Sequence, residues 1–245
     1  MVQIAGAEQG PRLSQVVKRV LVWWIDLRRD LRKGDRIELV YETFEGDEEP
    51  VAHALWFTSA KLGGTRTAVR FQIPSSRFAR WYESDGREVE SRLDPPPIKD
   101  YEQVTSLLKD GRRHKGVDFK APVGTPILAP FNGVVSRRNW SRRRNGNCLE
   151  LVNPKTGVNA FFLHLDSIPK HIQPGRRVKI GDTVALSGNT GRSTAPHLHY
   201  QLERRGKVLD PFRVQKTRQQ RLSPEDEQAA RAAWAQHEKM RAGSK

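Results

Sequence analysis

Five residues in the C-terminal half of the chain have the types and spacing of a metal site. They are His114 and Asp118 in the segment His114-Lys-Gly-Val-Asp118, His164, and the pair His197 and His199. Imidazole nitrogen and carboxylate oxygen bind zinc at about 2.0–2.2 Å, and a catalytic zinc keeps one coordination position for water. Two histidines and one carboxylate would form such an open site and leave two histidines for proton transfer. The chain has one cysteine, Cys148, which disfavours a closed structural zinc site.

Strand geometry explains how residues so far apart along the chain can meet. Side chains alternate between faces in an extended strand, so residues two or four apart point to the same side. His197 and His199 therefore share a face, and His114 and Asp118 do so as well if their segment is extended. His164 closes a strand-like run of its own and can supply a fifth group. Spacing alone predicts a metal site of unspecified purpose, because other divalent metals bind the same side chains.

The sequence around these residues is β-rich. Between residues 114 and 212, short apolar runs alternate with Gly, Pro and Asn at roughly the eight- to twelve-residue spacing of all-β domains. This rhythm predicts a mainly β protein whose C-terminal domain is a compact antiparallel sandwich or barrel. The expected strands span residues 116–119, 126–128, 133–137, 148–152, 159–164, 177–180, 183–187 and 197–203.

The remaining sequence predicts smaller parts around this domain. Apolar spacing predicts an amphipathic helix over 13–32, and turn signals separate strand-like runs between residues 36 and 82. Ser223-Pro-Glu-Asp-Glu227 combines an N-cap, an early proline and acidic residues, which predicts a helix to about Met240. The expected organisation is a leader over 1–12, a small α+β domain over 13–93, a Pro-rich linker over 94–110, the β domain over 111–214, and a basic tail with a helix over 215–245.

Composition limits the possible partners and locations. The net charge of +15 favours polyanionic partners such as nucleic acid, anionic membranes or an anionic cell-wall matrix, without choosing among them. The longest apolar run, Val20–Ile25, is six residues, far below the length of a membrane span. Residues 1–12 lack the basic start and apolar core of a signal peptide. We therefore expect either an intracellular protein or an exported protein whose signal is absent from this chain.

Several short motifs surround the five residues. They are His114-Lys-Gly-Val-Asp118-Phe, Ala121-Pro-Val-Gly-Thr-Pro126, Asn132-Gly-Val-Val135, Gly146-Asn147, Phe162-Leu-His164-Leu165, Pro174-Gly-Arg-Arg-Val178, Gly181-Asp182, Gly188-Asn-Thr-Gly191, Arg192-Ser193-Thr194 and Pro196-His-Leu-His-Tyr200. With these motifs, the segment from His114 to Phe212 resembles the lysostaphin/LytM-type zinc metallopeptidases, a family that cleaves peptidoglycan. The family usually has Tyr-Ala where this chain has Phe162-Leu163, a change expected to affect the groove wall and not the metal.

The resemblance implies a role for each of the five residues. His114, Asp118 and His199 would bind one Zn2+ ion, and His164 and His197 would be the catalytic histidines. The zinc would polarise the scissile carbonyl and acidify its bound water, while one histidine takes the proton and the other stabilises the oxyanion. The sequence does not say which histidine does which.

A second resemblance bears on the substrate. Residues 20–98 look like the small domain that precedes the catalytic unit in Gram-negative murein DD-endopeptidases, which implies cleavage of the D-Ala–diaminopimelate crosslink. The alternatives are a glycyl-glycine endopeptidase acting on Gram-positive walls, and a non-catalytic LytM-type amidase activator, which would usually lack one or more of the five residues. We expect a monomer in the periplasm or secreted, with a first domain that either covers the groove or docks onto substrate.

An arginine-rich stretch from Arg137 to Arg144 is a further candidate site. It reads as a hairpin loop with five arginines around an exposed Trp140. Trp140, Arg142 and Arg143 are predicted to contact an anionic or glycan polymer, with the indole stacking on sugar. The same composition suits nucleic acid. Because no nucleic-acid-binding fold signature accompanies it, we expect peptidoglycan as the partner.

Overall fold

A computed structural model describes residues 2–44, 49–108 and 114–243 of the chain. For residues 2–9 it describes the backbone alone. The chain divides into two compact units, one formed by Met1–Ser91 with Gln219–Lys245 and the other by Arg92–Arg218. Within the described part of the chain, no helix has both the length and the apolar character required to cross a membrane. The mainly β, antiparallel architecture expected from the sequence is confirmed.

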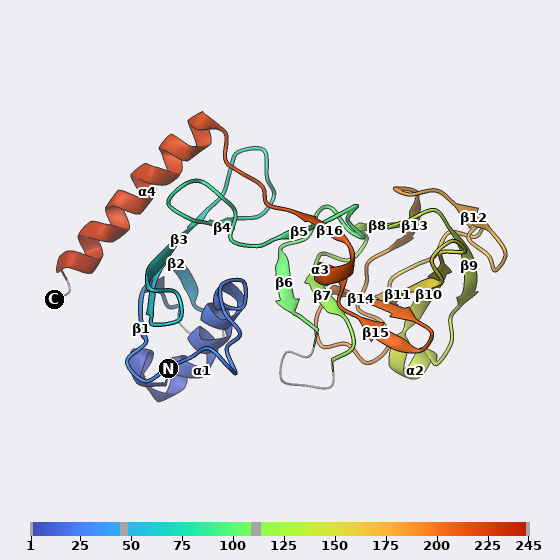
Figure 1. The fold of residues 1–245 in the computed structure, drawn as a ribbon, viewed down its shortest axis with the longest axis horizontal. Helices are drawn as coiled ribbons and strands as arrows, with labels where there is room; N and C mark the ends of the chain where they lie inside the picture. The colour runs from blue at the N-terminus through green and yellow to red at the C-terminus, as the bar shows by residue number, and fades with distance from the viewer. Residues whose placement is uncertain (1, 45–48, 109–113, 244–245) are drawn as a thin grey trace. The chain divides into compact units, whose positions relative to one another are not determined.

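The first unit is an antiparallel sheet with a helix on each face (Figure 1). Its elements are α1 (Val2–Leu21), β1 (Arg36–Glu42), β2 (Val51–Ser59), β3 (Gly64–Phe71), β4 (Arg80–Tyr82) and α4 (Pro224–Gly243), with the strands in the order β1-β2-β3-β4. Leu55 and Phe57 of β2 share a core cluster with Val17 of α1. Trp56 lies between them in sequence and so faces the opposite side, where its ring contacts Trp234 of α4 at 4.9 Å between centroids.

Helix α4 begins as the sequence predicts and is attached to the sheet through Trp56. The Ser223 hydroxyl accepts a hydrogen bond from the Asp226 amide at 3.1 Å, which caps the first turn. At the other end of the helix, the Trp56 indole donates to Glu238 at 2.7 Å, and the Arg241 guanidinium lies 4.9 Å from the indole centroid.

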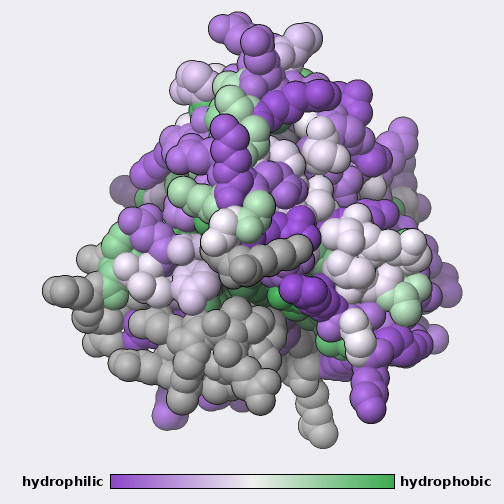
Figure 2. Space-filling model, turned by 90° about the vertical axis from the view of Figure 1, so that its left-hand side faces the viewer, coloured by the Kyte–Doolittle hydropathy of each residue, from purple (hydrophilic) through white to green (hydrophobic). Residues whose placement is uncertain are grey.

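The surface in Figure 2 is mainly hydrophilic, and its hydrophobic side chains form small, separate patches.

The second unit is built around one eight-stranded antiparallel sheet. Its elements are β5 (Arg92–Asp94), β6 (Gln103–Ser106), β7 (Val117–Lys120), β8 (Pro126–Leu128), β9 (Gly133–Arg138), α2 (Arg142–Asn145), β10 (Asn147–Val152), β11 (Val158–Leu165), β12 (Arg177–Val178), β13 (Thr183–Leu186), β14 (His197–Arg204), β15 (Lys207–Leu209), α3 (Pro211–Val214) and β16 (Lys216–Arg218). The large sheet has the order β12-β9-β10-β11-β14-β7-β6, and β15 pairs with β14. Two further sheets, β13-β8 and β16-β5, have two strands each.

The central strands of the large sheet are buried and fix the position of β14. Phe162 of β11 pairs with Tyr200 of β14, and both side chains are fully buried, with ring centroids 5.6 Å apart. Leu198 of β14 is buried as well. Because a slip of one residue would turn these apolar side chains to the other face, the register is strongly specified. The same register determines which way His197 and His199 point.

The structure differs from the sequence-based expectations at the ends of the domains. The expected leader over 1–12 is helical from Val2. The helix α1 ends at Leu21, where turns begin, and not at residue 32. The expected linker over 94–110 contains β6, which pairs with β7 inside the large sheet. The expected tail over 215–245 is divided, since β16 pairs with β5 while α4 packs in the first unit. Residues 109–113, where the linker was expected to meet the β domain, lie outside the described residues.

Candidate metal centre

Strands β7 and β14 place Asp118 and His199 opposite each other. The two strands pair antiparallel, with His199 facing Asp118 and His197 facing Lys120. Directly opposite residues of an antiparallel pair project on the same side of the sheet. The Nδ1 atom of His199 accordingly lies 2.8 Å from Oδ1 of Asp118. The alternation read from the sequence thus places one carboxylate and one imidazole at a common point.

His114 reaches the same point from the segment that precedes β7. Its Nε2 atom lies 3.1 Å from Oδ1 of Asp118 and 3.1 Å from Nδ1 of His199. This segment passes close above β14 at Gly116, where an added Cβ would come within 2.5 Å of the Tyr200 carbonyl and 2.8 Å of the His199 ring. A side chain at this position would displace the His114 segment, so glycine is required there.

The three ligand atoms fit a zinc ion by their spacing. Atoms bound at about 2.0–2.2 Å in tetrahedral geometry lie roughly 3.3–3.6 Å apart. The edges of the observed triangle, at 2.8, 3.1 and 3.1 Å, are slightly shorter. His114, Asp118 and His199 form a group that could hold a metal ion. A cation would bind all three atoms at once.

The outer ring nitrogens make the inner ones available as ligands. Nδ1 of His114 donates to the Leu107 carbonyl at 3.1 Å, with the Ser106 hydroxyl at 2.9 Å. Nε2 of His199 lies 3.4 Å from Oε1 of Gln201, which accepts a hydrogen bond from it. A histidine that donates from one nitrogen presents a lone pair on the other, as in most protein metal sites. Ser106, Leu107 and Gln201 were not singled out from the sequence, because only the strand pairing brings them behind the ligands.

The carboxyl group of Asp118 is an anion in this setting. Burial by itself would raise its pKa, but the adjoining imidazoles of His114 and His199 hold the pKa of Asp118 well below its usual value. A half-buried carboxylate that faces two imidazole nitrogens favours a bound cation. The electrostatics therefore agree with the spacing of the ligand atoms.

His164 lies beside this group in an unusual backbone conformation. It is the last residue but one of β11 and has a φ of 63°, in the left-handed region that non-glycine residues rarely adopt. Its ring is buried, and its centroid lies 4.8 Å from that of His197 and 6.2 Å from that of His199. Nδ1 donates to the Thr190 carbonyl at 2.9 Å, which leaves Nε2 as an acceptor. Burial lowers the pKa of His164 to about 4, so the ring is neutral at pH 7.

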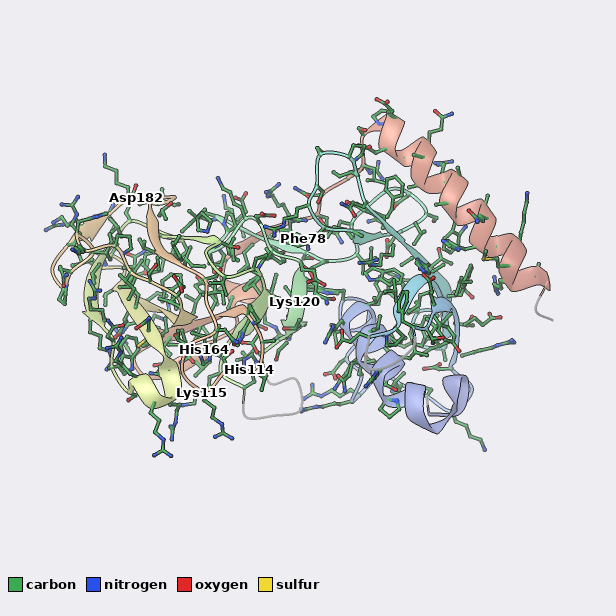
Figure 3. The ribbon with its side chains drawn as sticks, turned by 180° about the vertical axis from the view of Figure 1, so that it is seen from behind. Phe78, His114, Lys115, Lys120, His164 and Asp182 are labelled. Atoms are coloured by element: carbon green, nitrogen blue, oxygen red, sulfur yellow. The ribbon has the colours of Figure 1, made fainter. Side chains whose placement is uncertain are left out.

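His197 completes the set of five residues at the start of β14. Its Nδ1 donates to the Ala195 carbonyl at 2.8 Å, with the Ser193 hydroxyl at 3.2 Å. Its Nε2 lies 3.9 Å from Oδ1 of Asp118 and so faces the ligand group. The structure therefore brings together all five residues that the sequence singled out. Figure 3 shows two of them, His114 and His164, on the same side of the second unit.

Thr190 connects His164 to the neighbouring strands and was not singled out as a site residue. Its carbonyl accepts from His164, while its hydroxyl donates to the Leu165 carbonyl at 2.6 Å and accepts from the Asn147 amide at 2.9 Å. The threonine lies in the motif Gly188-Asn-Thr-Gly191, whose glycines indicate a close approach of backbones. That signal was present in the sequence, but it does not identify the partner.

The arginine-rich stretch differs in one respect from its sequence-based interpretation. Trp140 is half-buried, not exposed: its ring packs edge-on against Phe161 at 6.2 Å, and the Arg137 guanidinium covers it at 4.2 Å. Arg142 and Arg143 lie in the short helix α2 and are exposed. The indole is therefore engaged within the protein, while the arginines of α2 face outward.

Comparisons with known proteins agree with this geometry. The model of peptidase family M23 matches residues 112–211. The chain is 31% identical over 232 residues to the peptidoglycan DD-endopeptidase ShyC of Vibrio cholerae, covering 89% of this chain and 52% of ShyC. It is 29% identical over 220 residues to the DD-carboxypeptidase/endopeptidase Mpg of Neisseria meningitidis, covering 84% of this chain and 48% of Mpg. The chain thus spans about half the length of these curated relatives.

Solved structures similar to the chain include two peptidases. A zinc-containing peptidase from Vibrio cholerae is 28% identical with a TM-score of 0.45, covering 85% of this chain and 68% of that one. The catalytic domain of lysostaphin from Staphylococcus simulans is 34% identical with a TM-score of 0.38, covering 41% of this chain and 77% of that domain. Through the domain that contains residues 112–211, the chain belongs to peptidase family M23.

Proposed function

We propose that the chain is a zinc-dependent endopeptidase that hydrolyses the peptide crosslinks of bacterial peptidoglycan at the D-Ala–diaminopimelate bond, in the periplasm or after secretion. The observation that carries this proposal is the triangle of ligand atoms from His114, Asp118 and His199, with two further histidines beside it. The names of the relatives, peptidoglycan DD-endopeptidase and DD-carboxypeptidase/endopeptidase, support the substrate class.

Three residues would hold the zinc ion. Nε2 of His114, Nδ1 of His199 and a carboxylate oxygen of Asp118 are the ligand atoms, and hydrogen bonds on the far sides of both rings orient them. When bound, the ion supplies Lewis acidity, which polarises the scissile carbonyl and lowers the pKa of water toward 7. No serine or cysteine nucleophile is required for this chemistry.

His164 is the general base in this mechanism. Its ring is neutral, and its Nδ1 proton is engaged by the Thr190 carbonyl, so Nε2 is the atom that accepts a proton. It takes the proton of the attacking water and returns it to the amine that leaves. The buried position excludes bulk water from the ring and keeps the acceptor in one orientation.

His197 is the residue that stabilises the developing oxyanion. The Ala195 carbonyl fixes its Nδ1 proton, and its Nε2 faces the ligand group. When Nε2 is protonated, it donates a hydrogen bond to the carbonyl oxygen as negative charge accumulates there. The two histidines therefore have different roles although their rings lie in contact.

The test combines zinc content with activity on defined crosslinked muropeptides. We expect the purified chain to bind one equivalent of zinc and to cleave the D-Ala–diaminopimelate crosslink, with activity lost to a chelator and restored by zinc. His164→Ala should keep the zinc and lose about 10²- to 10⁴-fold in kcat, the usual contribution of general acid–base catalysis. His199→Ala should lose both zinc and activity. His171→Ala, at an exposed histidine outside the site, is the matched control and should behave as wild type.

Other outcomes would reassign the function. A His164→Ala variant with zinc and full activity would contradict the role of His164. Cleavage of pentaglycine-bridged muropeptides in preference to directly crosslinked ones would make the protein a glycyl-glycine endopeptidase. A zinc-loaded protein that cleaves neither substrate but stimulates an amidase would be an activator.

A further inference from the structure

The second unit contains an open hollow lined almost entirely by arginine. Its volume is about 740 Å³, within the usual range of ligand sites. The residues that line it, here called the arginine pocket, are Ser141, Arg142, Arg143, Arg144 and Arg192. Four come from the segment that contains α2, and Arg192 comes from the segment before β14. Two parts of the chain therefore bring four positive charges together around one hollow.

Within the described part of the chain, these four charges have no carboxylate counterion. Across the described ranges, no carboxylate forms an ion pair with the guanidinium of Arg142, Arg143, Arg144 or Arg192; Arg142 donates to the side-chain oxygen of Asn147 at 2.7 Å. Arg137 of the same stretch is different, because it pairs with Glu150 and covers the Trp140 ring. Like charges gathered without a counterion repel one another. An anion bound in the pocket would relieve that repulsion.

The two segments that form the pocket are locked to each other. The Arg192 amide donates to the Arg144 carbonyl at 2.9 Å. At Gly191 the backbones approach so closely that an added Cβ would lie 2.2 Å from the Gly146 nitrogen. The same glycine has a φ of 74°, which other residues rarely adopt. The pocket therefore has a preorganised backbone, which lowers the entropic cost of binding a ligand.

The pocket adjoins the two catalytic histidines. In the sequence, Arg192 lies between Thr190 and Ser193. The Thr190 carbonyl accepts a hydrogen bond from His164, and the Ser193 hydroxyl contacts Nδ1 of His197. In Figure 3, α2 lies on the same side of the second unit as the labelled His164. A substrate held at these histidines can therefore extend a neighbouring group toward the pocket.

We propose that the arginine pocket binds free carboxylate groups of the peptide next to the scissile bond and thereby selects acidic over amidated crosslinks. This inference rests on the proposed peptidase function. The planar guanidinium matches a carboxylate with two parallel hydrogen bonds, and an anionic substrate also gains from the charge of the pocket. A nucleic acid fits less well, because Trp140, the aromatic side chain of this stretch, packs against Arg137 and Phe161 and is not available for base stacking.

The test uses the full chain and two crosslinked peptides that differ only in having free or amidated carboxylates near the same scissile bond. The variant is Arg143→Gln with Arg192→Gln, and the control is Arg204→Gln with Lys207→Gln, which removes the same charge from two exposed residues that face each other in the β14–β15 pair. We expect kcat/KM on the acidic peptide to fall about tenfold in the variant, the order of one or two charge-assisted hydrogen bonds, and to stay unchanged in the control. On the amidated peptide, both double variants should match wild type.

Binding of the same two peptides, measured by calorimetry, separates this inference from the proposed function. Cleavage of both peptides at equal rates by wild type and variant would overturn the pocket and leave the peptidase intact. No cleavage, but binding of the acidic peptide that is lost in the variant, would overturn the peptidase and support the pocket. Tighter binding of an oligonucleotide or of anionic lipid vesicles than of the acidic peptide, also lost in the variant, would assign the pocket to that polyanion and overturn the inference.

Discussion

At the scale of single residues, the position of His164, the proposed general base, depends on Thr190, which takes no part in the proposed reaction. His164 has a left-handed backbone conformation, which costs about 1–3 kcal/mol at a non-glycine residue. Thr190 offsets this cost, because its carbonyl accepts from the ring while its hydroxyl joins the Leu165 carbonyl to the Asn147 amide. We therefore regard Thr190 as a positioning residue for His164.

Thr190→Val tests this positioning role, since valine keeps the shape of threonine and removes the hydroxyl. The Leu165 carbonyl and the Asn147 amide each lose a partner, and the Thr190 carbonyl shifts under His164. We expect kcat to fall about tenfold, the rate equivalent of roughly 1.4 kcal/mol in the barrier, with KM and zinc content unchanged. Thr190→Ser, which retains the hydroxyl, should recover most of the activity. Steady-state kinetics with zinc analysis measures both, and a valine variant that only unfolds more easily while keeping wild-type kcat would contradict the role.

At the scale of elements, strand periodicity explains which part of the site could be predicted. Alternation places His197 and His199 on one face, and the observed register between β7 and β14 adds Asp118 to that face. His114 is different: β7 begins at Val117, so the segment that holds His114 is not part of the strand. The sequence predicts that His114 is near the site through its spacing, but the close passage over β14 at Gly116 depends on strand pairing.

Helix α4 shows the same division between local and long-range information. Its N-cap and its extent follow from nearby residues, which is why the sequence predicts them. Its packing partner, Trp56, lies 182 residues away from Glu238 in sequence, and no local pattern identifies such a contact. The ring of Trp234 supplies the aromatic contact that holds the helix on β2.

Trp234→Ala tests the attachment of this helix. Removal of a half-buried indole deletes the contact with Trp56, and we expect a loss of about 2 kcal/mol in the free energy of unfolding of the first unit, below the roughly 3–5 kcal/mol of a fully buried aromatic. Trp234→Phe keeps an aromatic ring and should lose less than half of that. Denaturant unfolding followed by fluorescence and circular dichroism measures the difference, and equal stability of the alanine variant and wild type would show that α4 does not depend on this contact.

At the scale of the whole molecule, one of the two compact units is formed by two separate stretches of the sequence. The proline-rich segment near residue 94 indicates a break, and the units do separate near it, between Ser91 and Arg92. The chain then returns to the first unit after Arg218, so that α4 packs on a sheet formed more than a hundred residues earlier. Composition and periodicity describe neighbours in sequence, and they cannot show that a C-terminal helix completes an N-terminal unit.

Each part of the site lies inside the second unit, so a fragment of residues 92–218 should be sufficient for the chemistry. The fragment contains all five site residues, the eight-stranded sheet and its buried core, and its size is within the usual range of independent domains, about 50–250 residues. We expect it to unfold cooperatively, bind one equivalent of zinc and cleave the same crosslink as the full chain. The fragment with His199→Ala is the matched control and should fold without binding zinc.

The ratio of kcat/KM between fragment and full chain then measures the contribution of the first unit: a faster fragment indicates inhibition and a slower one indicates help in binding substrate. A fragment that folds but binds no zinc would contradict the assignment of the site to this unit alone.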